Sequence, residues 1–407
     1  MKRRIPHIAG ALAVLFLFAF PFIYNRADYD YIMHLWITAL FYAILASSWS
    51  LLGGYAGQFS FGHMAFMAIG AYSTGLLSNY IYITSVPTNI CSEFKLGDMY
   101  LVFLDPIGVT SGKLTCLDMA KQNWPADVVI SQPPIFWGIL LGILLGGLFG
   151  FLIGALVLRL RAAYLALFTI GFSEILRAAI SAEISITRGQ AGLKLVPLFS
   201  DGLTIFGKTY SAFDKVPPYF VMLFLFLFCM AIMIWLERSR FGLFIRSLRE
   251  DEEAAAALAV NTVRYKILVF VITSMMAAAA GAVQAHYVGI ITPNILILLQ
   301  MSIVIAMAVI GGLESIVGAA IGAIIITFTL EFLRSSFTIG SITIDMTIWR
   351  LVVFGLLLML TLRFWRNGLI HPILLWFSRA GTKQETVATR VAAGDTDLAE
   401  VETEELV

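Results

Sequence analysis

Long apolar segments are the feature of this sequence that most restricts its fold. The hydrocarbon layer of a bilayer is about 30 Å thick and takes roughly 20 apolar helical residues. Because no water satisfies the backbone there, only helices or closed barrels cross it, and these segments are too long for barrel strands. The sequence therefore predicts an all-α, polytopic membrane protein with about ten transmembrane helices. The expected spans lie near residues 8–23, 31–52, 60–83, 135–158, 163–181, 218–236, 265–290, 296–312, 315–334 and 348–365.

Short polar or glycine-rich breaks separate the seventh, eighth and ninth expected spans. The sequence reads TPN at residues 292–294 and GGLESIVG at residues 311–318. Either break could be a re-entrant bend within the membrane. The first span follows Lys2, Arg3 and Arg4, which is also how a signal peptide begins. No small residues follow it at the spacing of a cleavage site, so we expect an uncleaved helix.

The overall charge is nearly balanced, so the orientation has to be argued loop by loop. The 407 residues are 59% apolar with a net charge of +1, which gives no basic field for nucleic acid. Lys and Arg favour the cytoplasmic side, and placing both termini in the cytoplasm puts most of them there. The chain then divides into a transmembrane domain, 1–366, and an acidic cytoplasmic tail, 367–407, which we expect to be disordered. The domain includes an extracytoplasmic loop at 84–134 and a cytoplasmic connection at 237–264.

The densest charge cluster lies in this cytoplasmic connection, where residues 248–261 read LREDEEAAAALAVN. Acids suit the first turn of a helix, because they complement its exposed N–H groups and the positive end of its dipole. The alanines that follow favour a helix with a small, smooth face, which suits docking into a groove of another protein. A solvated helix that only joins two spans would have the same composition. The residues concerned are Glu250, Asp251, Glu252, Glu253, Ala254, Ala255, Ala256 and Asn261.

Other motifs with chemical meaning are few. Residues 202–209, GLTIFGKT, match a phosphate-binding pattern, but no strand before them or helix after them is expected, so we interpret them as a hairpin-like loop. The five histidines have no metal-ligand spacing, and no metal site is predicted. Cys91 and Cys116 share the extracytoplasmic loop, where an oxidising compartment would permit a disulfide. Two free thiols are the alternative.

One ion pair is expected inside the membrane. Glu174 and Arg177 are three residues apart on the fifth span, so their side chains lie on one face and can neutralise each other. They could line a polar path, or they could hold helices together as a structural pair, which is the interpretation we favour. A proton-driven carrier would need acids or histidines in several spans, and Glu174 is the one acid expected near the bilayer centre.

Small residues crowd segments 53–71 and 311–323, as expected where helices approach closely. Both segments begin with a pair of glycines and continue as a span rich in glycine and alanine. An internal repeat around a central pathway would produce two such segments, and so would ordinary helix packing.

Four ordered blocks of the sequence carry a recognisable pattern. The first is LLGGYAGQFSFGH at residues 51–63, followed by IGAY at 69–72. The others are LRLRAAYLALFTIGFSEILRAAI at 158–180, ERSRFGLFIRSLREDEEAAAALAVNTVRYKILVFVITS at 237–274 and IGGLESIVGAAIGA at 310–323. Together these blocks resemble the LivM-type permeases of branched-chain amino acid ABC importers. The resemblance covers most of residues 51–360.

The resemblance implies a permease subunit in the inner membrane rather than an enzyme, with branched-chain amino acids as its substrate. It implies that the chain has no cofactor of its own, and that ATP with Mg²⁺ binds a separate ATPase. Residues 250–261 would contact that ATPase as a coupling helix. The implied partners are a second homologous permease, two ATPases, a periplasmic substrate-binding protein and membrane lipid. Candidate residues of the translocation path are Gln58, Ser60, His63, Glu174, Arg177, Thr187, Gly189 and Gly192.

Three departures from the family pattern keep other substrates open. Arg188 stands where the family often has the first glycine of T-G-G-x-x-G, and Ala259 stands where it has the glycine of G-I-N. The loop at 84–134 and the tail are longer than the family usually carries. A urea or short-chain amide permease is therefore the alternative within the class. An independent secondary carrier or a channel is the alternative outside it.

Overall fold

The computed structural model describes most of the chain. It covers residues 5–23, 29–84, 95–96, 99–103, 129–131, 133–157, 162–184, 186–199, 203–205, 208–211, 214–334, 337–339, 342–344, 346–364 and 368. Two predictions fall outside these residues. They are the bridge between Cys91 and Cys116, and the tail at 367–407 apart from Gly368.

Helices form the body of the protein, which confirms the all-α prediction. One helix lies over each expected span: α1 (Ile5–Ile23), α2 (Tyr29–Trp49), α3 (His63–Ser78), α5 (Ile135–Val157), α6 (Ala162–Ala182), α7 (Val216–Arg238), α10 (Thr262–Val288), α11 (Leu298–Gly311), α12 (Ile316–Phe332) and α13 (Met346–Phe364). Two further helices, α8 (Arg240–Glu250) and α9 (Glu252–Ala257), occupy the connection before α10.

Length and composition decide which of these helices could cross a membrane. Within the described residues, five segments are long and apolar enough: Tyr29–Tyr55, Ile135–Val157, Tyr164–Ala182, Val216–Arg238 and Thr262–Val288. Together α11 and α12 meet the same test, but the pair is bent by 119° at its break, as in a broken span or a re-entrant loop. The protein is therefore polytopic. The count of ten spans and the side on which the termini lie stay predictions.

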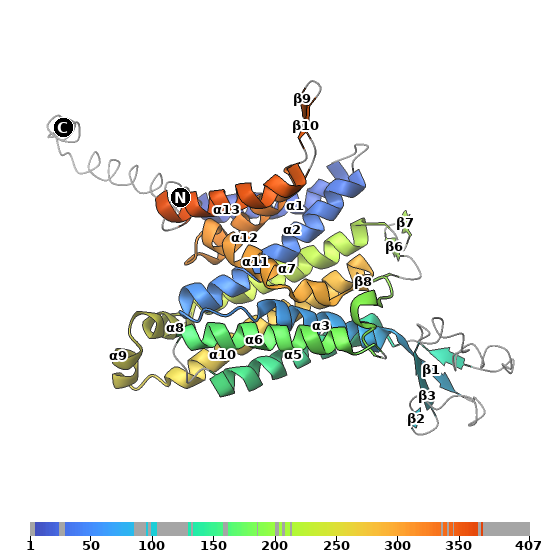
Figure 1. Ribbon diagram of the computed structural model, residues 1–407, viewed down its shortest axis with the longest axis horizontal. Coiled ribbons are helices and arrows are strands. Elements are labelled where there is room, and N and C mark those ends of the chain that lie inside the picture. The colour runs from blue at the N-terminus through green and yellow to red at the C-terminus, as the bar shows by residue number, and fades with distance from the viewer. Residues whose placement is uncertain are drawn as a thin grey trace.

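The helices run side by side, with α8 and α9 at one end of the bundle and short strands at the other (Figure 1). We call these the α9 end and the strand end. Four antiparallel strands pair in the order β2-β3-β1-β4, and two antiparallel hairpins are β6–β7 and β9–β10. Their bounds are β1 (Tyr80–Thr84), β2 (Lys95–Leu96), β3 (Met99–Phe103), β4 (Val129–Ser131), β6 (Leu203–Ile205), β7 (Lys208–Tyr210), β9 (Phe337–Ile339) and β10 (Ile342–Ile344).

The hairpin β6–β7 settles the interpretation of the phosphate-binding pattern. Thr204 pairs with Thr209, and Ile205 pairs with Lys208. Lys208 therefore begins a strand, whereas a phosphate-binding loop would continue there into a helix. The interpretation of this segment as a hairpin-like loop is confirmed.

Glycines allow α3, α5 and α10 to pack with their backbones in contact. A Cβ atom at Gly70 of α3 would overlap the carbonyl oxygen of Ala278 in α10. A Cβ atom at Gly142 of α5 would lie 2.8 Å from the carbonyl oxygen of Gly70. In α11 and α12, Gly311 and Gly318 meet in the same way. The close approach predicted for both small-residue segments is confirmed, and the internal repeat stays a prediction.

Three interruptions divide the helices, and two of them fall where the sequence predicted bends. Residues after α10 form β8 (Ile290–Ile291) and the 3₁₀ turn η4 (Pro293–Leu296) before α11 begins. The second interruption separates α11 from α12. The third was not predicted: α2 continues as a π-helix, η2 (Ser50–Tyr55), all of whose residues are buried. Bulges of this kind are frequent at functional sites.

Candidate functional site

The connection between α7 and α10 is built from two helices whose ends are fixed by side-chain caps. The Asp251 carboxylate accepts hydrogen bonds from the backbone N–H groups of Glu253 (2.9 Å) and Ala254 (3.0 Å), and so caps α9. The Asn261 side chain caps α10 by accepting from the N–H of Arg264 at 3.0 Å. The acids were expected to share one first turn. Glu250 instead ends α8, because Asp251 adopts an extended conformation between the two helices.

One face of α9 packs inward and the rest is exposed. Ala255 is 3% exposed, whereas Ala254, Ala256 and Ala257 are exposed. Leu258, directly after the helix, is 80% exposed, which is the highest value of any large apolar residue in the described part of the chain. An apolar side chain at the α9 end, beside exposed alanines, forms a small apolar surface on an otherwise acidic segment.

Arg249 connects this segment to two of the helix interruptions. Its Nη1 donates a hydrogen bond to the carbonyl oxygen of Gly54 in η2 at 2.7 Å. Its Nη2 contacts Glu314, between α11 and α12, at 2.5 Å. Arg249 therefore links α8 to η2 and to the α11–α12 break.

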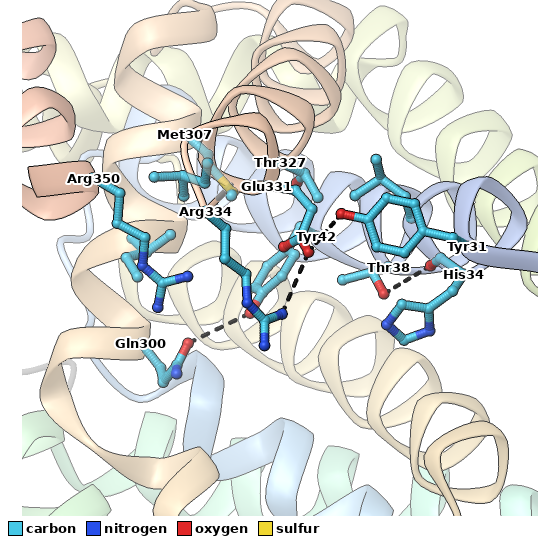
Figure 2. A pocket seen from close by; sticks show the side chains of 13 residues that line it. Tyr31, His34, Thr38, Tyr42, Gln300, Met307, Thr327, Glu331, Arg334 and Arg350 are labelled. Carbon is cyan, nitrogen blue, oxygen red and sulfur yellow. Dashed lines mark hydrogen bonds and ion pairs between the residues drawn. The ribbon is translucent and has the colours of Figure 1, made fainter. Parts of the chain in front are cut away.

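A cavity of about 230 Å³ lies between α2, α11, α12 and α13, and we call it the polar cavity. Figure 2 shows that the side chains of Tyr31, Gln300, Arg334 and Arg350 border one space. The Glu331 carboxylate accepts hydrogen bonds from the Tyr31 hydroxyl (2.8 Å) and from Arg334 (3.3 Å). The residues that line it are Tyr31, His34, Leu35, Thr38, Tyr42, Gln300, Ile303, Met307, Thr327, Leu330, Glu331, Arg334 and Arg350.

A second cavity, of about 280 Å³, adjoins the first, and we call it the apolar cavity. Its walls come from α2, α3, α10 and the β8–η4 segment, and they are mostly aliphatic, aromatic and methionine side chains. Tyr42 and Gln300 line both cavities, and the Tyr42 hydroxyl donates to the Gln300 Oε1 at 3.4 Å. These two residues therefore lie between the polar cavity and the apolar cavity.

Three of the predicted path residues lie after α6, and one of them contacts the wall of the apolar cavity. Thr187, Gly189 and Gly192 belong to the turn around η3 (Gly189–Ala191) and β5 (Leu193–Lys194). Because β5 pairs with β8, a Cβ atom at Gly192 would lie 2.9 Å from Thr292, which lines the cavity. Gly192 therefore packs against the wall of the cavity, and none of the three residues lines it.

Gln58 and Ser60 lie in the turn between η2 and α3, His63 is the first residue of α3, and all three are buried. Ser60 accepts a hydrogen bond from the Trp49 indole at 2.7 Å through its carbonyl oxygen. Both amide atoms of Gln58 and both ring nitrogens of His63 have no partner within the described residues. Buried polar atoms are costly when unpaired, so this turn is suited to contact with water or a passing solute.

The two remaining path candidates form the predicted pair on α6. The Arg177 Nε lies 2.8 Å from the Glu174 Oε2, and the side chains are 33% and 41% exposed, respectively. Neither residue lines the polar or the apolar cavity. The predicted contact between the two charges is confirmed.

We expect single neutral variants of this pair to be worse than the double variant. Glu174→Gln or Arg177→Gln leaves one charge on the outer face of a membrane helix, whereas the double variant leaves none. A partly exposed pair of this kind contributes about 1 kcal/mol of coupling free energy. A thermal unfolding series of the four detergent-solubilised proteins measures that coupling. Additive effects of the two single variants would contradict a structural pair.

Sequence reasoning missed the residues that line the polar cavity. Gln300, Glu331 and Arg350 come from three helices, Arg334 follows the end of α12, and the four have no shared spacing. The available signal was the presence of amide and charged side chains at the edges of apolar spans, since such residues are costly there. That signal identifies individual residues, but it does not indicate which of them lie next to one another in the folded protein.

The fold and the site are those expected of a membrane transport permease: a polytopic bundle with broken helices beside two adjoining cavities. Residues 31–362 match the family of permease components of branched-chain amino acid transport systems. Because this match covers most of the chain, the chain belongs to that family. Its members are transport subunits, so the protein is a permease and not an enzyme.

Three relatives illustrate the range of similarity. The high-affinity branched-chain amino acid transport permease LivM of Salmonella typhimurium is 27% identical over 354 residues, 82% of this chain and 71% of the relative. LivM of Escherichia coli is 28% identical over 362 residues, 84% and 72% of the two chains. The permease LivH of Salmonella typhimurium is 36% identical over 145 residues, 35% and 46%. No solved structure matches the chain significantly.

Proposed function

We propose that this chain is one permease subunit of an ATP-driven importer that moves branched-chain amino acids across the inner membrane by alternating access. Family membership and the LivM relatives support the substrate class. Similarity to both LivM and LivH supports a second, homologous permease as partner. Two ATPases that bind ATP and Mg²⁺ and a periplasmic substrate-binding protein complete the proposed complex.

The observation that carries this proposal is the construction of α9. It is short, is capped by Asp251, exposes alanines and is followed by the exposed Leu258. The preceding helix α8 is linked through Arg249 to two helix interruptions. Such a helix can seat in a groove of an ATPase and pass its movement to the bundle. The α9 end would then be cytoplasmic. The C-terminal end of α13 would lie on that side as well, because Gly368 packs against Gly312 beside the α11–α12 break.

Reconstitution tests the function directly. The chain, its homologous permease, the two ATPases and the binding protein are assembled in proteoliposomes, and uptake of labelled leucine, isoleucine and valine is measured. We expect uptake that requires ATP and binding protein. Uptake of urea or short amides without amino acid uptake would establish the alternative substrate class. Amino acid uptake driven by a proton gradient without ATP would establish a secondary carrier.

The docking role of α9 predicts a specific effect of bulk on its exposed face. Ala256→Trp is expected to lower ATPase copurification roughly fivefold, equivalent to ~1 kcal/mol, because the indole cannot seat where a methyl group fits. Ala255 is unsuitable for this test because it packs inside the chain. The matched control is Ala182→Trp, at the exposed last residue of α6 near the strand end. Equal ATPase recovery from both variants would reject docking and favour a solvated connection.

A further inference from the structure

We propose that the polar cavity binds the α-carboxylate and α-ammonium groups of an amino acid, and that the adjoining apolar cavity receives its aliphatic side chain. The inference rests on the proposed function and deepens it, because it assigns the substrate to named residues. Ligand sites are concave, largely apolar and supplied with a few convergent polar groups. The two cavities together have this composition.

In this proposal, Arg350 and Arg334 bind the α-carboxylate of the ligand. No described residue forms a hydrogen bond or an ion pair with Arg350. Its guanidinium points toward the same space as the Arg334 guanidinium and the Gln300 amide (Figure 2). A guanidinium presents parallel N–H donors that match the two oxygens of a carboxylate. Two such groups around one space form an anion site whose charge Glu331 only partly offsets.

Glu331 binds the α-ammonium group of the ligand. Its side chain is 22% exposed, and the Tyr31 hydroxyl and Arg334 both donate to its Oε1. An ionised carboxylate has about four acceptor positions, so two contacts leave capacity for an ammonium group. The cavity therefore offers an acid and two guanidinium groups to a ligand that carries both charges. A neutral amide such as urea would match none of these charges.

The position of Tyr42 and Gln300 orients the ligand. They line both cavities, so a molecule whose charged end lies beside Arg350 can extend past them. On the far side it meets Met64, Met67 and Ile295. Methionine is flexible and adapts to different aliphatic shapes. This wall can therefore accept leucine, isoleucine and valine alike.

Protection of an introduced thiol tests the site in the assembled complex. Thr38 lines the polar cavity, so the rate at which Thr38→Cys reacts with a maleimide reports occupancy, followed at that peptide by mass spectrometry. The probes are leucine, leucinamide, which lacks the carboxylate, and 4-methylpentanoate, which lacks the ammonium. Leucine is expected to protect at concentrations about tenfold lower than either analogue, a difference of ~1.4 kcal/mol.

Charge variants assign each end of the ligand. Arg350→Gln is expected to weaken protection by leucine and by 4-methylpentanoate about tenfold and to leave leucinamide unchanged. Glu331→Gln is expected to weaken protection by leucine and leucinamide and to spare 4-methylpentanoate. Arg363→Gln, at the other end of α13, is the matched control and should change none of the three.

The outcomes separate this inference from the proposed function. Equal protection by the three probes, or leucine protection that neither variant alters, overturns the assignment of the site. Absence of protection in a complex that transports leucine also overturns the site, and it leaves the function intact. A complex that transports urea and no amino acid overturns both.

Discussion

Replacement of Gly281 by valine is expected to separate α3 from α10 and to destabilise the protein by about 3 kcal/mol, the upper end of the usual cost of overpacking. A Cβ atom at Gly281 would overlap the carbonyl oxygen of Met67 and lie 2.8 Å from its carbonyl carbon. Because the overlapping atoms of Met67 belong to the backbone, no change of side-chain rotamer relieves the overlap. Met67 and Gly281 also line the apolar cavity, and a shift of either helix would deform it.

The effect is measured as the midpoint of thermal unfolding and as the monodisperse fraction after detergent extraction. Gly355→Val in α13 is the matched control, since nothing lies within 4 Å of a Cβ atom placed there. Both changes put a valine into a helix, so intrinsic helix propensity affects them equally. A Gly281 variant as stable as the Gly355 variant would contradict the close packing of α3 against α10.

Arg249→Gln is expected to uncouple ATP hydrolysis from transport while the ATPases still copurify. A hydrogen bond from a charged donor contributes roughly 1.5–3 kcal/mol, so loss of the contact to Gly54 corresponds to roughly a 30-fold fall in uptake per ATP. The contact to Glu314 contributes less, because the Glu314 side chain is 64% exposed. Glu314→Gln should therefore have a much smaller effect than Arg249→Gln.

The ratio of leucine uptake to ATP hydrolysis in proteoliposomes measures this coupling. Arg240→Gln, on the exposed surface of the same helix α8, removes a positive charge without touching either interruption and serves as the control. Normal coupling in the Arg249 variant, or an equal loss in both variants, would show that Arg249 does not transmit the movement of α9.

The spans were predictable because the bilayer restricts them so strongly. A segment such as 135–158 has one stable arrangement in hydrocarbon, and α5 covers it within one residue. The breaks at 292–294 and 311–318 were visible as proline, asparagine and glycine inside apolar sequence. The π-helix η2 was not predicted, because its residues have the same apolar character as the helix that it extends.

The cavities could not be predicted for a different reason. Tyr31 and Glu331 are separated by 300 residues and meet only when α2 packs near α12. Periodicity reports the face of one helix, and it contains no information on which helices become neighbours. The orientation of α9 was equally hidden, because six residues are too few to show which alanine packs inward.

The π-helix η2 also limits the kind of motion that the α9 end can pass to the bundle. Each turn of a π-helix contains more residues than a turn of an α-helix, so η2 stores extra chain. Rewinding it as α-helix by one residue would rotate the following segment by about 100° around the helix axis. Gln58 lies in the turn after η2 and His63 begins α3, so such a rotation would move their unpaired polar atoms toward another side of the bundle. Arg249, which donates to the Gly54 carbonyl, would oppose this rotation.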